Sequence, residues 1–322
     1  MSLAKAVLVT GATGFVGSGV LTRLVESSDT KLLGLVRTRG AQLPINVLPV
    51  LMSDEGLMGN VPLQGVEVIV HCAARVHVMD DRTSEPLSEF RKVNVDGTLN
   101  LARQAVAVGV KRFIFISSIK VNGEGTKLGV PYAADDDPKP MDPYGISKME
   151  AEKGLQQLAK ETGLEVVIIR PVLVYGPGVK ANFQTMMKWL SKGVPLPLGA
   201  VHNKRSLVAL DNLVDLIVTC LDHPAAANQT FMVSDGEDLS TAELLSRISG
   251  ALGRPARLLP VPVWLLELGA AIVGRRDVAR RLCGSLQVDI SKTRELLGWA
   301  PPIPVDEALA KTVKAFQANK NG

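Results

Sequence analysis

Short runs of consecutive apolar residues recur along the first half of the chain. Stretches with helical spacing separate them. Strands that are apolar at every position are typical of sheets covered on both faces, and intervening helices favour parallel pairing. The pattern therefore predicts an α/β fold with a doubly wound parallel sheet. The expected strands are 6–10, 32–36, 66–71, 112–117 and 165–170, and the expected helices are 18–26, 86–108 and 143–162.

The composition of the sequence changes after Arg170. Proline and glycine become frequent in PVLVYGPGVKANF and KGVPLPLGAVHNKRS, which predicts binding loops rather than long regular elements. With 322 residues the chain is longer than one typical domain. We therefore expect a first domain at 1–178 and a smaller lobe at 179–322, with returns to the sheet near 205–235.

Composition excludes several classes of protein. The net charge is +4 and no run of five like charges occurs, so nucleic acid is not an expected partner. Three scattered cysteines and four histidines without metal-ligand spacing predict neither a disulfide framework nor a metal site. The most apolar helix candidate, 263–274, carries Glu267 and is too short to span a bilayer. No signal-peptide pattern precedes the first strand, so we expect a cytoplasmic protein without membrane insertion.

A glycine-rich loop, TGATGFVG, connects the first expected strand to the first helix. Gly11, Gly14 and Gly17 permit a tight turn and let backbone amides at the helix start approach a pyrophosphate. The spacing Gly-x-x-Gly-x-x-Gly differs from the commoner Gly-x-Gly-x-x-Gly. Its position at the start of a βαβ series nevertheless favours a dinucleotide site over a plain structural turn.

Two arginines follow the second expected strand, GLVRTRG. A carboxylate usually lies about 20 residues past such a glycine loop and accepts from the adenosine ribose. Here Arg37 takes that place, with Arg39 close behind. Because a guanidinium pairs with a 2′-phosphate, the expected cofactor is NAD(P)(H), with NADP(H) favoured and NAD(H) left open. The alternative is that both arginines are solvated loop charges.

The stretch DPYGISKME puts Tyr144 four residues before Lys148, on one face of the expected helix. A free phenol titrates near pH 10, but a nearby ammonium and an oxidised nicotinamide stabilise its phenolate, which can then move a proton. The same spacing also occurs in ordinary exposed helices. The fourth expected strand, however, ends in Ser117 and Ser118, at the edge where open α/β sheets bind ligands.

These motifs together resemble the extended short-chain dehydrogenase/reductases, which include nucleotide-sugar epimerases, dehydratases and ketoreductases. The resemblance runs from about residue 5 to 310 and is carried, in the family's order, by TGATGFVG, HCAA, KVNVDGT, the strand-end serines and Tyr-x-x-x-Lys. It implies a Rossmann-type domain with a smaller C-terminal substrate-binding lobe. It also implies a homodimer formed through the helices near 86–108 and 144–162.

The resemblance assigns roles to individual residues. Tyr144 is the expected acid/base, Lys148 holds the nicotinamide ribose and lowers the pKa of the phenol, and Ser118 hydrogen-bonds the reacting oxygen. Asn122 departs from the family, which usually has tyrosine there. The other expected cofactor contacts are Gly11, Thr13, Gly14, Phe15, Val16, Gly17, Arg37, Asp54, Ala73, Ala74, Asn94 and Pro171.

The second half resembles the part of these proteins that binds a UDP-sugar. Asn182 and the segment PLPLG, with Leu196 and Leu198, match the regions that hold the diphosphate-sugar and the uracil. Arg205 matches a diphosphate-binding arginine, a role that suits a planar cation. A second arginine is expected at Arg280 or its neighbour. The alternative is that the segment KRS, which contains Arg205, is a solvated loop.

The residues after Ser118 narrow the reaction. Ile119 and Lys120 stand where the family's 4,6-dehydratases have Asp and Glu, and they cannot supply that acid–base pair, so dehydration is disfavoured. Hydride transfer at C4 of a UDP-sugar remains. The detailed resemblance favours a UDP-4-keto-6-deoxy-N-acetylhexosamine 4-reductase of surface-polysaccharide biosynthesis, with a UDP-hexose 4-epimerase as the alternative. A steroid- or flavonoid-type ketoreductase and an NADP-sensing regulator are remoter alternatives.

Overall fold

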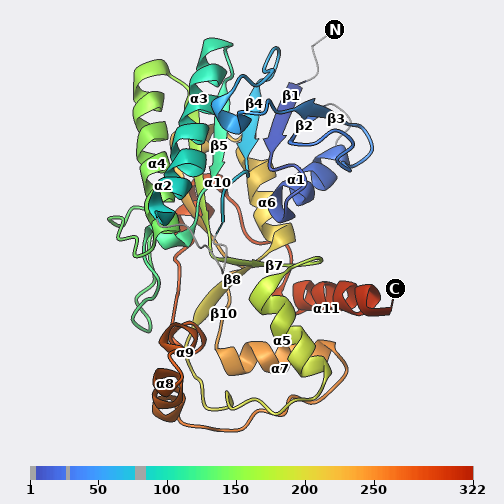
Figure 1. Cartoon of the computed structure of the whole chain (residues 1–322), viewed down its shortest axis with the longest axis vertical. Helices are drawn as coiled ribbons and strands as arrows, with labels where there is room; N and C mark the ends of the chain where they lie inside the picture. Colours follow the sequence, from blue (N-terminus) through green and yellow to red (C-terminus); the bar gives the residue numbers. More distant parts are fainter. Residues whose placement is uncertain (1–4, 27–29, 77–84, 322) are drawn as a thin grey trace.

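In the computed structural model, which describes residues 5–26, 30–76 and 85–321, the main sheet has seven parallel strands in the order β3-β2-β1-β4-β5-β6-β9 (Figure 1). The expected parallel α/β fold is confirmed. Residues 1–4, where no signal peptide is expected, lie outside the described residues. The strands are β1 (Lys5–Thr10), β2 (Thr30–Val36), β3 (Val47–Leu51), β4 (Val68–His71), β5 (Arg112–Ile116), β6 (Glu165–Pro171) and β9 (Thr230–Val233).

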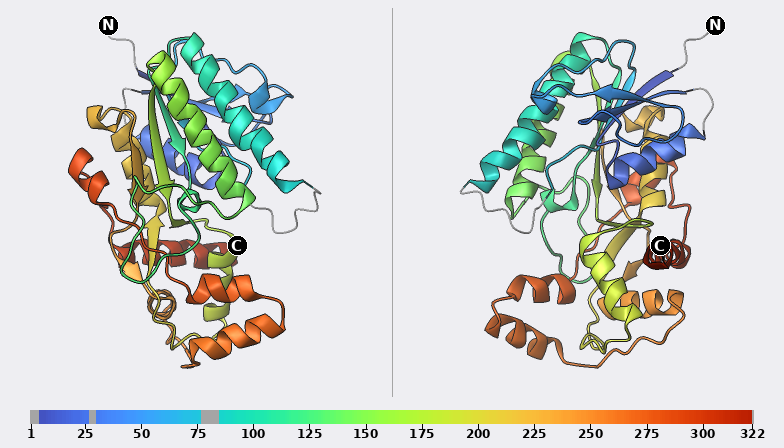
Figure 2. Two further views of the ribbon diagram at one scale, coloured as in Figure 1. Left: turned by 90° about the vertical axis from the view of Figure 1, so that its left-hand side faces the viewer. Right: turned by 45° about the vertical axis from the view of Figure 1, so that its right-hand side comes forward.

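Helices cover both faces of this sheet, and a separate apolar core fills each side (Figures 1 and 2). Neighbouring residues of β1 divide between the two cores: Val7 and Val9 belong to one and Leu8 to the other. Burial on both faces explains why the strands read as continuous apolar runs. One face carries α1 (Phe15–Val25), α6 (Leu210–Cys220) and α10 (Ser291–Leu297), and the other carries α2 (Pro86–Arg91), α3 (Gly97–Ala107) and α4 (Pro143–Thr162).

The second half of the chain builds a smaller lobe, seen in the lower part of Figure 1. Its three-stranded sheet has the order β10-β8-β7. Residues 205–235 therefore divide, with β8 in this small sheet and β9 in the main one. The elements of the lobe are β7 (Leu173–Tyr175), α5 (Ala181–Ser191), β8 (Arg205–Ala209), β10 (Asp238–Leu239), α7 (Thr241–Ala251), α8 (Val263–Ile272), α9 (Arg276–Cys283) and α11 (Val305–Asn321).

A segment at 285–289 ties the two parts of the molecule together. On one side its backbone pairs with the loop after β5: the Ser285 carbonyl accepts from Thr126 N at 2.9 Å, and Asp289 N donates to the Tyr132 carbonyl at 2.9 Å. On its other side Leu286 exchanges backbone hydrogen bonds of 2.9 Å with residues 204 and 206, at the start of β8. The small lobe is thus hydrogen-bonded to a loop of the large domain.

The helix expected at 86–108 is divided by a turn of π-helix. This turn, η2 (Lys92–Asp96), lies between α2 and α3 and buries Asn94. Wider turns of this kind occur often at functional sites. The remaining short helices are η1 (Gly56–Met58), η3 (Ile119–Val121) and η4 (Pro224–Ala226), all of the 3₁₀ type.

A buried ion pair fastens α4 to the main sheet. Arg170, near the end of β6, donates from Nε and Nη2 to the two carboxylate oxygens of Glu152 at 3.0 and 2.6 Å. The two side chains are 5% and 2% exposed. Ser117 donates to the same carboxylate, and Arg170 also donates to Asn122 Oδ1 at 3.0 Å. Asn122, the departure from the family pattern, therefore belongs to the buried network.

Glu152→Gln is expected to lower the free energy of unfolding by about 3–5 kcal/mol, because it leaves the buried Arg170 guanidinium without a counter-charge. Glu150→Gln on the same helix is the control, since the pair of Glu150 with Arg91 is half-exposed and worth at most about 1 kcal/mol. Urea unfolding of both variants measures the difference. Equal, small losses would contradict a structural role for the buried pair.

Candidate active site at the carboxyl edge of the sheet

The loop between β1 and α1 forms a cradle that leaves no room for side chains. Gly11 has a φ of +64°, and a Cβ there would lie 2.9 Å from the backbone nitrogen of Ala73. A Cβ on Gly17 would lie 2.2 Å from the Gly11 carbonyl oxygen. Gly14 is the N-cap residue of α1. Thr13 and Gly14 are both exposed. Exposed residues at a helix start, with bare backbone around them, fit the pyrophosphate of a dinucleotide.

His71 ends β4 and links it to β1 and α3. Its Nδ1 lies 2.8 Å from Thr10 Oγ1 and its Nε2 lies 2.9 Å from Thr98 Oγ1. Ala73 N donates to the same Thr10 hydroxyl at 3.1 Å, which holds Ala73 beside the glycine cradle. Burial, aided by the positive charge of Lys148, lowers the pKa of His71 to about 3, so the ring is neutral. The sequence pattern predicted no role for His71, although its position at a strand end was the available signal.

Asn94 in the π turn joins the segment after β4 to the start of α4. Its Nδ2 donates to the Arg75 carbonyl and to Ser147 Oγ, both at 3.0 Å, and its Oδ1 accepts from Arg75 N at 2.8 Å. Ser147 in turn donates to the Tyr144 carbonyl at 2.8 Å. Asn94, an expected cofactor residue, is fully buried. Through Ser147 it orients the backbone of Tyr144, the expected catalytic residue.

Tyr144 is the second residue of α4. The helix begins here because Asp142 accepts from Gly145 N at 2.6 Å as its N-cap and Pro143 fits the first turn. The ring of Phe90 packs edge-on against the phenol, with ring centroids 6.0 Å apart. Burial and then the negative charge of Asp142 raise the pKa of Tyr144 to about 12, while a hydrogen bond with Ser118 opposes the rise. The protein alone therefore keeps the phenol protonated at neutral pH.

Lys148 lies one turn after Tyr144 and is 2% exposed. Its Nζ donates to the Ile116 carbonyl at 2.7 Å and lies 4.3 Å from the centroid of the Phe115 ring. Burial lowers the pKa of this ammonium to about 8. The pKa of Tyr144 is raised, chiefly by burial, whereas the sequence pattern predicted that Lys148 lowers it.

The other expected cofactor residues follow strands at the same edge, because β1 to β6 run parallel. Arg37 comes directly after β2 and is exposed, and Asp54 is exposed in the turn after β3. Pro171 ends β6 and is buried. The half-buried residues of this set are Phe15, Val16, Ala73 and Ala74.

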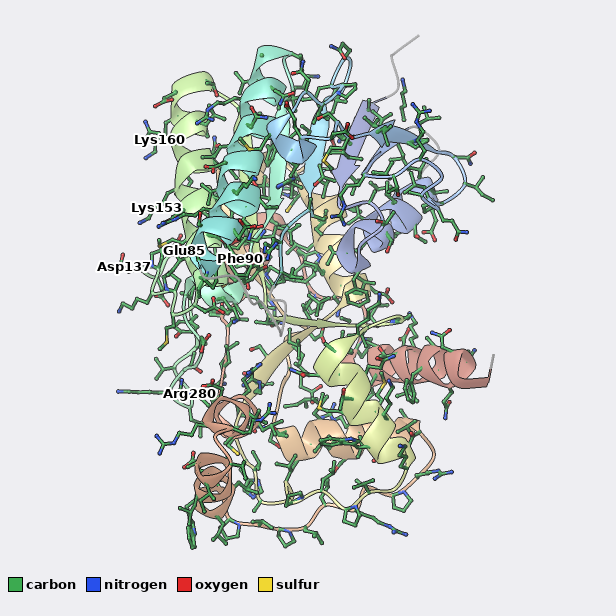
Figure 3. All side chains as sticks on the ribbon, in the orientation of Figure 1. Glu85, Phe90, Asp137, Lys153, Lys160 and Arg280 are labelled. Atoms are coloured by element: carbon green, nitrogen blue, oxygen red, sulfur yellow. The ribbon has the colours of Figure 1, made fainter. Side chains whose placement is uncertain are left out.

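The residues expected to bind substrate come from the small lobe, and they range from buried to exposed. Arg205 begins β8, and its Nη1 donates to the carbonyls of Arg281 at 3.0 Å and Gly284 at 3.1 Å, while burial lowers its pKa. Asn182 is exposed in the first turn of α5. Leu196 is buried in the core of the lobe, Leu198 is half-buried, and Arg280 is exposed on α9 (Figure 3).

Lys120, which stands where the dehydratases have glutamate, forms ion pairs with Asp142 and, at 3.5 Å, with Glu124. It is thus held as a cation beside the start of α4. Among the residues that the structure describes, no three His, Cys, Asp or Glu side chains gather as metal ligands. Nor does any helix in that part of the chain have the length and apolarity needed to cross a membrane.

Residues 7–234 match the model of the NAD dependent epimerase/dehydratase family. The chain belongs to this family. It is 52% identical over 328 residues to a UDP-glucose 4-epimerase of Vibrio cholerae, covering 98% of this chain and 97% of that one. A UDP-glucose 4-epimerase of Mycolicibacterium smegmatis is 31% identical, covering 96% and 98%. The structure of a Thermotoga maritima UDP-glucose 4-epimerase with UDP-glucose matches with a TM-score of 0.77 and 26% identity, covering 98% and 99%.

These findings confirm the resemblance to the extended short-chain dehydrogenase/reductases, so the chain is an NAD(P)-dependent enzyme of that fold. They also correct the order of the two predicted reactions. Sequence analysis ranked the 4-ketoreductase first, whereas the relatives fit the 4-epimerase alternative better.

The ring of His71 is expected not to titrate between pH 8 and 5, as followed by histidine NMR resonances. Its pKa in the folded state lies below the value of about 6.5 expected for the unfolded chain, so the resulting stability is present above pH 6.5 and lost as pH falls towards 3. Urea unfolding at pH 7 and 5 should differ by about 2 kcal/mol from this group. His71→Gln is expected to remove that part of the pH dependence. A His71 ring that titrates near pH 6.5 would contradict a neutral ring buried between Thr10 and Thr98.

Proposed function

We propose that this enzyme is a UDP-hexose 4-epimerase that acts on UDP-glucose or UDP-N-acetylglucosamine. The observation that carries the proposal is the 52% identity, over nearly the whole chain, to a protein of that activity, and the hydrogen bond of Tyr144 with Ser118 supports it. A role in surface-polysaccharide biosynthesis fits an enzyme that prepares sugar nucleotides.

The proposed reaction uses Tyr144 twice. When bound, NAD(P) would take the hydride from C4 and return it to the opposite face of the 4-keto sugar, and in its oxidised form it would bring a positive charge near the phenol. Tyr144 takes the proton of the C4 hydroxyl as that carbon is oxidised, and Ser118 donates a hydrogen bond to the same oxygen. After the 4-keto sugar has rotated so that its opposite face meets the nicotinamide, Tyr144 returns the proton to the C4 oxygen. Lys148 orients the nicotinamide ribose and, as a cation, favours the phenolate against burial.

The diphosphate of the substrate is assigned to Arg205. This guanidinium is already oriented by two carbonyls at the end of α9, which leaves its other nitrogens available for phosphate oxygens. Asn182, Leu196, Leu198 and Arg280 remain predicted substrate residues. Of these, the exposed Asn182 and Arg280 are the ones a ligand can reach without repacking the small lobe.

We further propose that the enzyme is a homodimer formed through α3 and α4, which lie side by side on one face of the sheet (Figure 2). Lys153 and Lys160 project outwards from α4 (Figure 3), so this interface would have polar as well as apolar contacts.

Tyr144→Phe is expected to lower kcat about 10²- to 10⁴-fold with little change in UDP-sugar affinity, because it removes only the proton carrier. Conversion of UDP-glucose to UDP-galactose without added reductant, followed by NMR, measures this. Tyr132→Phe is the control, since the Tyr132 hydroxyl donates to the Gly125 carbonyl within the loop after β5. Equal turnover by wild type and Tyr144→Phe would refute the assignment.

A parallel assay separates the two C4 reactions. UDP-4-keto-6-deoxy-N-acetylglucosamine is incubated with NADPH or NADH, and UDP-glucose and UDP-N-acetylglucosamine are incubated without reductant. Consumption of reductant, with neither UDP-hexose epimerised, would overturn the epimerase in favour of the 4-ketoreductase.

The proposed cofactor preference is for NADP(H), because Arg37 is exposed directly after β2. Arg37→Ala should weaken NADP⁺ binding about 10- to 100-fold and leave NAD⁺ binding nearly unchanged, since a charge-assisted pair is worth about 1.5–3 kcal/mol. Titration calorimetry with both dinucleotides tests this, with Arg23→Ala on α1 as the control. A preference for NAD⁺ that survives Arg37→Ala removes the inference.

A further inference from the structure

Helix α8 leaves its apolar face uncovered. The helix has no buried residue. Its large apolar side chains at 264, 265, 268 and 272 share one side of the helix, whereas the half-buried Val263, Leu266 and Ala270 lie on the opposite side. The exposed fractions are 63% for Trp264, 41% for Leu265, 52% for Leu268 and 77% for Ile272. This α8 stripe is apolar throughout, with Glu267 at its margin.

The chain segment that contains α8 and α9 is rich in arginine. Residues 254–284 contain six arginines and two carboxylates, so this segment carries the whole net charge of +4 and the rest of the chain is neutral. Every one of the six is exposed. They are Arg254, Arg257, Arg275, Arg276, Arg280 and Arg281. An apolar stripe on a helix that is followed closely by Arg275 and Arg276 is complementary to a surface that is apolar below a layer of anions.

The stripe lies at one end of the molecule. Figures 1 and 2 place α8 at the tip of the small lobe, far from the main sheet. Leu259, in the loop that leads to α8, is also 51% exposed. Tryptophan is favoured where an apolar layer meets charged headgroups, and Trp264 occupies the first turn of α8.

We propose that α8 and α9 form a docking surface for the face of a bilayer rich in anionic phospholipid. Trp264, Leu268 and Ile272 enter the boundary between headgroups and acyl chains, and Arg275 and Arg276 pair with headgroup phosphates. With ten residues, α8 lies in the plane of the bilayer surface and does not cross it. Charge favours a lipid over a second copy of the chain, because two copies meeting through this face would bring the same arginines together.

Flotation of the full-length protein with vesicles tests the proposal. Vesicles of phosphatidylcholine alone are compared with an equal mixture of phosphatidylcholine and phosphatidylglycerol. The wild type is expected to float with the mixed vesicles, to stay behind with the neutral ones, and to be released by high salt. Tryptophan emission should shift to shorter wavelength on binding, measured in a Trp189→Phe background, in which Trp264 is exposed and the remaining Trp299 is buried.

Matched variants separate the stripe from general charge or hydrophobicity. The variant Trp264→Glu/Leu268→Glu/Ile272→Glu and the variant Arg275→Glu/Arg276→Glu should each lower vesicle binding by about tenfold or more. The controls Ile45→Glu/Leu48→Glu and Arg23→Glu/Lys31→Glu make comparable changes on exposed residues of the large domain and should bind as wild type. Melting temperature and UDP-glucose turnover of each variant check that it is folded.

Several outcomes would overturn the proposal. They are absence of binding to either vesicle, equal binding by the stripe variants and the wild type, or binding to neutral vesicles alone. Light scattering that shows self-association lost in the stripe variant, with no vesicle binding by the wild type, would identify the face as an interface between copies. Tyr144→Phe should float like the wild type, so this result does not depend on the proposed epimerase activity.

Discussion

The buried pair of Arg170 and Glu152 is the constraint on which the candidate site depends. Glu152 lies four residues after Lys148 and eight after Tyr144, on the helix that carries both. The same carboxylate holds Ser117, next to Ser118, at the end of β5. One desolvated ion pair therefore fixes the register between the helix and the strand end that must meet at the reacting oxygen. A slip of either element would leave a charge unpaired in the interior.

The burial that gives this precision opposes the proton transfer. It raises the pKa of Tyr144 and lowers that of Lys148, so both groups are held towards their neutral forms. The neutral His71 behind them adds no charge. Positive charge that arrives with a dinucleotide would thus act in a medium of low polarity, where its effect on the phenol is large. The acidity of the Tyr144 phenol therefore depends on whether a dinucleotide is bound.

The sequence predicted the elements that burial or local capping determines. The strands of the sheet centre are continuous apolar runs, and Asp142 with Pro143 marks the start of α4. It did not predict β3, an edge strand interrupted by Pro49, or the π turn at Asn94, which depends on tertiary hydrogen bonds. The residue types of the site could be predicted from the ends of the strands. The Ile116 carbonyl that accepts from Lys148 could not be predicted, because this contact depends on how deeply the lysine is buried.

The segment at 285–289, hydrogen-bonded to both lobes, limits how the protein can move. A hinge between the lobes would have to break backbone pairs on one side of this segment, each of which would need a new partner in water. The lobes are therefore set in place before a ligand arrives, and binding loses less conformational entropy than it would if the lobes had to close. We therefore expect the contacts of the ligand and the motions of loops, rather than a domain motion, to set the rate of ligand exchange.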